Sequence, residues 1–283
     1  MGRVSHTVVG VREVEGALRK LGIEKRPIEV HVSVRSFGGL EDGPATIVDG
    51  VLAAGSTVLA ATMAPDLFGI PAPPDDRPAQ NGIDYSMPAS MAGDSQPKEP
   101  IGAYDPTRTE VSAWLGAFSA HVAARPDRIR CRYASGEFSA VGPLASRLIG
   151  AETDADVFGP LRALVEENGA VVLMGVGLTR MTLLHLAEVE AGRRPFIRWA
   201  RGRDGRAVRV RAGECSEGFE SLAPTLVAVE RRLVVGASQW RVFPAREALE
   251  LAADAIRTNP SITHCPNPEC IECADAIAGG PLE

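Results

Sequence analysis

The stretch IEVHVSVRSFGGLEDGPATIVDGVLAAGSTVLAATM, residues 28–63, decides the fold. Apolar and polar residues alternate over 28–34, which predicts a strand that ends before the glycine pair at Gly38. Pro44 stands near the start of a helical segment and Gly55 near its end. The β-prone segment STVLAATMA follows directly. Strand, glycine loop, helix and strand in this order indicate a βαβ unit, with parallel strands and the helix packed across them.

The rest of the chain alternates helical and strand patterns around one irregular segment. Residues 64–109 are rich in Pro, Gly, Asp and Ser, so we expect either a long loop over or beside a functional cleft or a disordered linker. Helices are expected at 7–22, 109–124, 158–169, 181–192, 219–230 and 245–260, a short strand and a short helix within 128–150, a strand at 170–177, a hairpin at 195–213 and a strand pair at 231–244. The expected class is α/β, a single domain over 1–283 with a central mixed sheet flanked by helices.

The composition favours an ordinary soluble globular protein. Of the 283 residues, 45% are apolar and 23% are charged, and the net charge is -6. This charge argues against nucleic acid as a partner, because phosphate binding needs a basic face. No signal peptide or membrane span is expected. The five cysteines are an odd number and three lie in one short tail, which fits a reducing cytoplasm better than a disulfide scaffold.

The segment HVSVRSFGG, residues 31–39, combines a strand end with a glycine turn and a helix start. Backbone N–H groups in such a turn can hold a phosphate, with charge from Arg35 and hydroxyls from Ser33 and Ser36. The alternative is a tight strand-to-helix turn with no ligand.

A second candidate site lies in GVGLTRMTLLHLAEVEAG, residues 175–192. In a helix, His185 and Glu188 stand on one face as i and i+3. A neutral imidazole can accept the proton of an attacking amine, and a nearby carboxylate can orient that imidazole. The alternative is a buried histidine with a purely structural role.

A third candidate is GECSEGFESL, residues 213–222, where Glu214 and Glu217 flank Cys215. An acidic rim suits a ligand rich in amines. The alternative is a solvated loop that precedes a helix.

The Cys-containing C-terminal tail, residues 261–283, contains HCPNPECIEC. Cys265, Cys270 and Cys273 have C-x4-C-x2-C spacing, and His264 adjoins the first of them. These four side chains can hold a structural Zn²⁺ ion, distant from His185. The alternative is a set of reduced thiols in a polar loop.

Five segments, in order, resemble the aminoglycoside 3-N-acetyltransferase family, the antibiotic N-acetyltransferases that are unlike the commoner GNAT fold. The resemblance covers roughly residues 10–260. The segments are HVSVRSFGGLEDGPATIVDGVL, GSTVLAATMAPD, ARPDRIRC to FSAVGP, VVLMGVGLTRMTLLHLAE and ECSEGFESL.

The resemblance implies acetyl transfer from acetyl-CoA to an amine of an aminoglycoside, directly within a ternary complex. His185 would be the general base, and Glu188 would orient it or face the substrate. The implied acetyl-CoA residues are Ser33, Val34, Arg35, Ser36, Gly38 and Thr62; the implied acceptor residues are Glu137, Thr179, Glu214 and Glu217.

The chain also differs from the family pattern. Thr179 stands where the family usually has Asp, and Met181 where it has Asn. The segment RYASGE stands where the family has His-Pro, and Glu137 at its end is expected to supply the missing carboxylate. Two alternatives therefore stay open: an acetyltransferase for another amine, and a CoA-binding homologue without catalysis. A monomer or a homodimer is expected.

Overall fold

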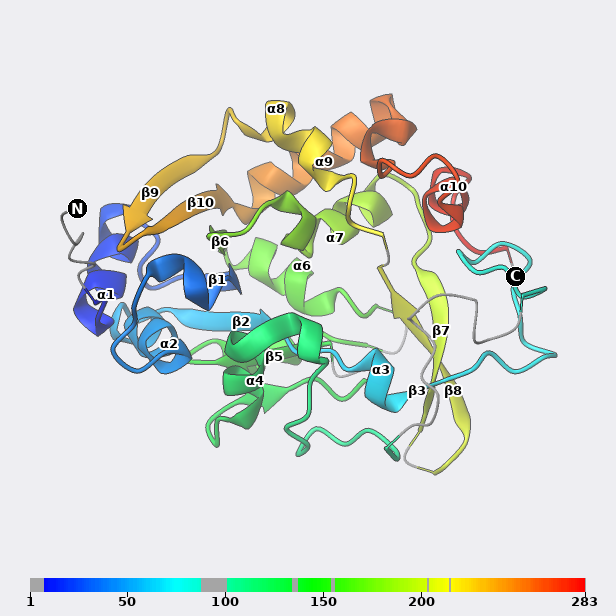
Figure 1. The fold of residues 1–283 in the computed structure, drawn as a ribbon, viewed down its shortest axis with the longest axis horizontal. Helices are drawn as coiled ribbons and strands as arrows, with labels where there is room; N and C mark the ends of the chain where they lie inside the picture. Colours follow the sequence, from blue (N-terminus) through cyan, green and yellow to red (C-terminus); the bar gives the residue numbers. More distant parts are fainter. Residues whose placement is uncertain are drawn as a thin grey trace, which may run out of the picture.

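The computed structural model describes residues 8–87, 101–133, 137–153, 156–202, 204–213 and 215–282. Its centre is a seven-stranded sheet with the strand order β4-β5-β2-β1-β6-β10-β9 (Figure 1). These strands are β1 (Pro27–Val32), β2 (Thr57–Ala61), β4 (Ile129–Arg130), β5 (Phe138–Val141), β6 (Ala170–Met174), β9 (Arg231–Val235) and β10 (Ser238–Pro244).

The three central strands are parallel and the flanking strands are antiparallel. β1 pairs in parallel with β2 on one side and with β6 on the other. β5 and β10 pair antiparallel with the outer edges of this trio, and β4 and β9 extend the sheet further. The predicted βαβ unit and the mixed sheet are confirmed. Because β1 lies at the middle of the sheet, its carboxyl end and the turn that follows lie beside the end of β6.

Helices cover both faces of the sheet because the central strands are apolar on both sides. In β6, Val172 and Met174 pack into one core cluster, whereas Val171 and Leu173 pack into the other. One face carries α1 (Val11–Lys20), α2 (Pro44–Ala53) and α4 (Gly116–Ala124); the other carries α5 (Ala145–Ile149), α6 (Gly159–Glu166), α7 (Leu183–Glu190), α8 (Ala223–Leu226) and α9 (Ala245–Thr258). No described helix combines the length and the apolar character of a membrane span.

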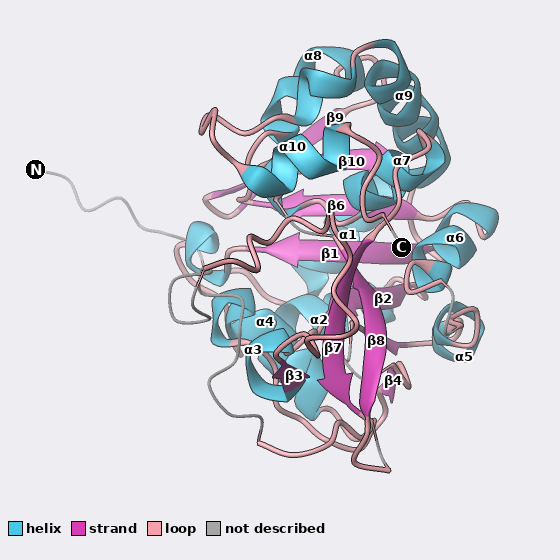
Figure 2. Cartoon of the chain, turned by 90° about the vertical axis from the view of Figure 1, so that its right-hand side faces the viewer, coloured by secondary structure: helices cyan, strands magenta, loops and turns pink. Residues whose placement is uncertain are grey.

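A smaller antiparallel sheet stands across the end of the central one (Figure 2). It consists of β3 (Gly69–Ile70), β7 (Phe196–Arg201) and β8 (Ala207–Ala212). The predicted hairpin is confirmed, and its turn places Gly205 at φ +80°, a backbone conformation that favours glycine. Helix α10 (Ile271–Ile277) lies beside this sheet, because the Arg194 N–H before β7 donates to the Gly279 carbonyl oxygen.

Three sequence expectations need correction. The helix expected at 109–124 begins only at Gly116, whose φ of +80° separates it from a 3₁₀ turn over Ala113–Leu115. The helix expected at 219–230 is a 3₁₀ turn followed by the short α8, because Pro224 lacks an N–H group and restarts the helix. The irregular segment 64–109 contains α3 (Pro65–Phe68) and β3, although residues 88–100 lie outside the described ones. The remaining 3₁₀ turns are η1 (Val34–Phe37), η3 (Leu178–Arg180), η4 (Phe219–Leu222) and η5 (Pro260–Thr263).

Close packing of α1 on α2 generates a stability prediction. A Cβ at Gly50 in α2 would lie 2.5 Å from Val14 Cβ in α1, whereas a Cβ at Gly16 in α1 would meet nothing within 4 Å. We expect Gly50→Ala to lower the free energy of unfolding by about 1–3 kcal/mol, because the two helices must separate. Gly16→Ala, the matched control, should raise it by up to about 1 kcal/mol through helix propensity. Urea unfolding followed by circular dichroism measures both; equal stabilities would contradict the packing argument.

Candidate active site

A cleft of about 1050 Å³ opens where the ends of β1 and β6 meet the β7–β8 hairpin. Its volume suits a substrate larger than a single metabolite fragment. The wall includes the segment 63–70, so the irregular region does border the cleft, as expected from the sequence. Six residues predicted from the sequence line it: Ser33, Val34, Arg35, Glu137, Thr179 and His185.

His185 lies in the first turn of α7, and one of its ring nitrogens is hydrogen-bonded to Glu188. Its Nδ1 is 2.9 Å from Glu188 Oε2, and both side chains are largely buried. A carboxylate accepts only, so the hydrogen on this bond belongs to Nδ1 while the imidazole is neutral. Nε2 then carries the lone pair, and within the described part of the chain it has no hydrogen-bond partner. The pair thus presents a basic nitrogen at the wall of the cleft.

Glu188 is itself held from behind. Its other oxygen, Oε1, contacts the buried guanidinium of Arg193 and lies 3.4 Å from Thr263 Oγ1. Arg193 also donates to Thr263 Oγ1, at 2.9 Å, and to the carbonyl oxygen of Pro260. The carboxylate therefore orients the imidazole and is tied to the C-terminal segment. Glu188 contacts His185 and is not among the residues that line the cleft.

Two neighbours fix the plane of the imidazole. Phe219 meets the ring edge-on, with 4.8 Å between centroids. The backbone of Gly213 passes so close that a Cβ there would overlap the ring. A glycine is needed at this position because any side chain would displace the histidine.

The glycine turn after β1 divides into a part that faces the cleft and a part that supports it. Ser33, Val34 and Arg35 line the cleft. Ser36 Oγ donates to the Ser33 carbonyl oxygen and lies 2.7 Å from Ser238 Oγ, so the hydroxyl is engaged within the protein. Gly38 ends η1 at φ +78°. Direct ligand contact is therefore open to residues 33–35, whereas Ser36 and Gly38 shape the turn.

Two further residues predicted from the sequence, Thr62 and Glu217, are not among those that line the cleft. Thr62 is fully buried, and its Oγ1 is 2.9 Å from Ser139 Oγ, so it supports β2 rather than contacting a ligand. The side chain of Glu217 is exposed and lies outside the cleft lining. Glu214 lies outside the described residues.

A second histidine borders the cleft and was not singled out from the sequence. His31 in β1 places Nε2 3.0 Å from the buried Glu29 carboxylate, and the Thr182 N–H lies 3.4 Å from the same nitrogen. Sequence reasoning passed over Glu29 as a polar residue of an alternating strand. A carboxylate in the centre of a sheet covered on both faces is the signal that could have identified this pair.

The fourth side chain beside the three tail cysteines is Cys215, whereas the sequence predicted His264. The sulfur atoms of Cys215, Cys265, Cys270 and Cys273 all lie within 4.8 Å of one another. His264 instead places Nδ1 2.8 Å from the carbonyl oxygen of Cys265 and is not in this group. The structure therefore groups Cys215, and not the predicted His264, with the three tail cysteines, because the loop after β8 lies against the tail.

Comparison with known proteins supplies the family. The family model for aminoglycoside 3-N-acetyltransferases matches residues 30–257. The chain belongs to the aminoglycoside 3-N-acetyltransferase family. The resemblance seen in the sequence is confirmed, and with it membership in a family of acetyl-CoA-dependent acetyltransferases.

Similar proteins in this family match most of the chain. Aminoglycoside N(3)-acetyltransferase VIII of Streptomyces fradiae is 29% identical over 250 residues, 81% of this chain and 82% of that protein. A variant of aminoglycoside acetyltransferase AAC(3)-IVa in complex with a gentamicin is 25% identical, with a TM-score of 0.72 over 98% of this chain and 100% of that one. AAC-IIIb, solved with CoASH, is 21% identical, with a TM-score of 0.66 over 89% and 97% of the two chains.

The contact between Arg193 and Glu188 generates a second stability prediction. Arg193→Met would leave the Glu188 carboxylate without its buried cation, which is expected to lower the free energy of unfolding by up to about 3–5 kcal/mol. Arg194→Met, one position along and exposed, is the matched control and should change it by less than about 0.5 kcal/mol. Thermal and urea unfolding measure both. A stability of Arg193→Met equal to that of the control would show that the network does not stabilise the fold.

Proposed function

We propose that this protein transfers the acetyl group of acetyl-CoA to the 3-amino group of an aminoglycoside, with His185 as general base. The observation that carries the proposal is the 2.9 Å contact between His185 Nδ1 and Glu188 at the wall of the cleft. It leaves Nε2 as the basic atom that faces the substrate. The family membership agrees with this assignment, and so does the solved relative in complex with a gentamicin.

The reaction needs one proton to move. The amine nitrogen attacks the thioester carbonyl while His185 Nε2 accepts the proton of that amine. The new C–N bond forms, the C–S bond breaks, and the proton passes from the imidazolium to the departing sulfur, which gives the amide and free CoA. Glu188 holds the imidazole in the required tautomer and stabilises the imidazolium while it exists. No nucleophilic serine or cysteine is required, because the two substrates react directly.

The cleft offers cations for the phosphates of CoA. Arg35 and Arg180 both line it, next to the glycine turn at residues 33–35. Guanidinium groups bind phosphate through paired N–H groups. The solved relative with CoASH agrees with acetyl-CoA as the co-substrate. The acetyl-CoA side of the reaction is therefore proposed at the carboxyl end of β1.

The residues that line the cleft define the amine acceptor less specifically than they define the acetyl-CoA side. Asp66 and Glu137 are cleft-lining carboxylates that could hold ammonium groups of an aminoglycoside, and Thr179 offers only a hydroxyl. Arg198 also lines the cleft, which disfavours a densely cationic ligand there. These observations support a second candidate function, acetylation of an amine that carries fewer positive charges. A cytoplasmic location, where thiols stay reduced, is part of the same proposal.

Replacement of the general base tests the mechanism. We expect His185→Asn to lower kcat by about 10²–10⁴-fold while acetyl-CoA still binds, because proton transfer is lost and the cofactor wall is unchanged. Release of thiol from acetyl-CoA measures turnover, and calorimetric titration with CoA measures binding. His121→Gln, on α4 and away from the cleft lining, is the control and should keep its turnover. Full activity of His185→Asn would remove the assignment.

Glu188 is a positioning residue, and its substitution should separate kcat from KM. Glu188→Gln retains an acceptor oxygen but loses the charge, so we expect kcat to fall by about 10–100-fold with little change in the KM for acetyl-CoA. Steady-state kinetics at varied acetyl-CoA provides the test. A large rise in that KM with unchanged kcat would place Glu188 in cofactor binding instead.

The acceptor is identified by a panel of amines. Turnover with 2-deoxystreptamine aminoglycosides, lost in His185→Asn, would establish the leading proposal. Turnover only with amines of lower charge would establish the second candidate. CoA binding without acetyl transfer to any amine would favour a homologue that has lost catalysis.

A further inference from the structure

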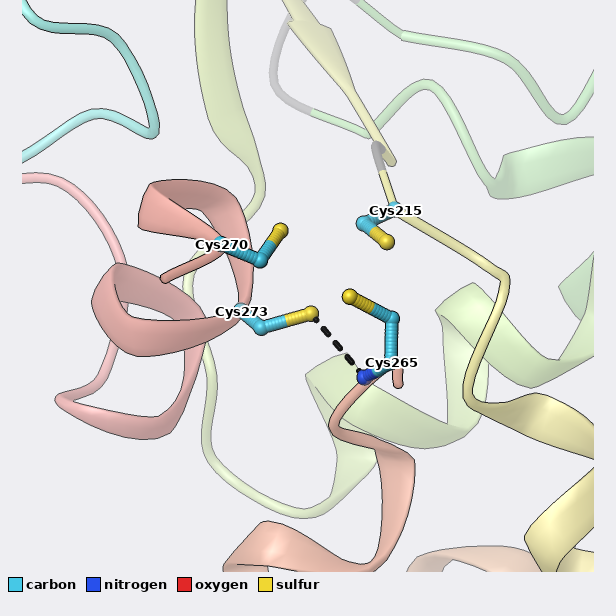
Figure 3. Close-up of side chains that lie close together, drawn as sticks. All are labelled: Cys215, Cys265, Cys270 and Cys273. Carbon is cyan, nitrogen blue, oxygen red and sulfur yellow. Dashed lines mark hydrogen bonds between the residues drawn. The ribbon is translucent and has the colours of Figure 1, made fainter. Parts of the chain in front are cut away.

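Four cysteine side chains from three separate segments point into one space (Figure 3). Cys215 follows β8, Cys265 follows η5, and Cys270 and Cys273 lie at the start of α10. Their sulfur atoms all lie within 4.8 Å of one another, and all four are free thiols. In a tetrahedral zinc–thiolate site with bonds of about 2.3 Å, the sulfur atoms stand about 3.8 Å apart. The spacing here therefore fits one ion at the centre.

The surroundings of the sulfurs suit thiolates. The backbone N–H of Cys265 points at Cys273 Sγ at 3.4 Å, and the backbone N–H of Glu217 is hydrogen-bonded to Cys215 Sγ. Donors directed at sulfur orient metal-bound thiolates and offset their charge. Cys265 and Cys273 are buried, whereas Cys215 and Cys270 are half-buried, so the site lies just below the surface.

We propose that Cys215, Cys265, Cys270 and Cys273 bind one Zn²⁺ ion in a closed tetrathiolate site. Soft thiolate ligands in a tetrahedron select Zn²⁺ over the oxygen-preferring cations. With all four positions taken by sulfur, the ion has no open position for water or substrate, so its role is structural.

The cysteine cluster holds two segments that contact the proposed general base His185 and its partner Glu188. Gly213, whose backbone lies against the His185 ring, is two residues before Cys215. Gly218, three residues after it, packs directly on the backbone of Thr263 and His264, where a Cβ would not fit. Thr263 in turn contacts both Glu188 and Arg193. Zinc at this point ties the loop after β8, which borders the large cleft at Gly213 and Ser216, to the tail.

Metal analysis of the purified protein, grown with zinc and never exposed to chelator, tests the proposal. We expect one zinc ion per chain by plasma mass spectrometry. Cys215→Ser and Cys270→Ser should each lose it. Two controls should keep it: Cys131→Ser, the fifth cysteine, buried in the central core away from the cluster, and His264→Asn, the neighbour that the cluster excludes. Loss of zinc in His264→Asn would overturn the tetrathiolate set.

A second measurement covers variants that fail to fold. Exchange of the wild-type metal for Co²⁺ should give the intense visible bands of tetrahedral thiolate coordination, and removal of the metal by chelator should lower Tm and turnover together. Wild-type protein that contains no zinc and reacts with a thiol reagent at all four positions without denaturant would refute the proposal. A wild-type protein mass lower by two hydrogens per disulfide, which would show that the cysteines form disulfides, would also refute the proposal. The finding of iron in place of zinc would refute it as well.

Discussion

The hydrogen bond between His185 Nδ1 and Glu188 is the interaction on which the rest of the active site depends. An imidazole free to rotate would present either nitrogen to the cleft and would spend part of its time in the wrong tautomer. Glu188 removes that freedom only because it is itself fixed by Arg193 and by Thr263. His185, the proposed base, is therefore positioned by a chain of contacts that runs from α7 to the C-terminal segment.

The sheet explains why the cleft lies where it does. The parallel strands β1 and β6 end at the same edge of the sheet, where β1 leads into the turn η1 and β6 leads into the turn η3. Ligands bind at such edges in open α/β sheets. The alternating apolar residues of 28–34 and the apolar run at 170–174 predicted the two strands, because both patterns are local, but not that the strands are neighbours in the sheet. The hairpin turn at Gly205 and the helix over 245–258 were predictable for the same reason.

What escaped prediction depends on contacts between distant parts of the chain. Arg193 looks like an ordinary surface residue after a helix, and only the fold buries it between Glu188 and Pro260. His264 was a reasonable zinc ligand by adjacency, yet the backbone turn directs its ring to a carbonyl oxygen. Cys215 stands 50 positions before Cys265, so no local spacing could join them. Thr62 carries a residue type expected near a ligand, but it directly follows a strand buried on both faces and is itself buried.

These distant contacts share one consequence for how the enzyme is built. The cleft wall made by the sheet is packed on both faces, whereas no described residue of the tail belongs to the buried set of either large core cluster. Such segments normally open at low energetic cost. The proposed general base His185 lies against these segments, and the proposed metal cross-link would constrain them without adding apolar volume. In this proposal the four cysteines and the contacts among His185, Glu188 and Arg193 form one structural unit. The tail then fixes the orientation of the His185 ring, which the central sheet does not fix by itself.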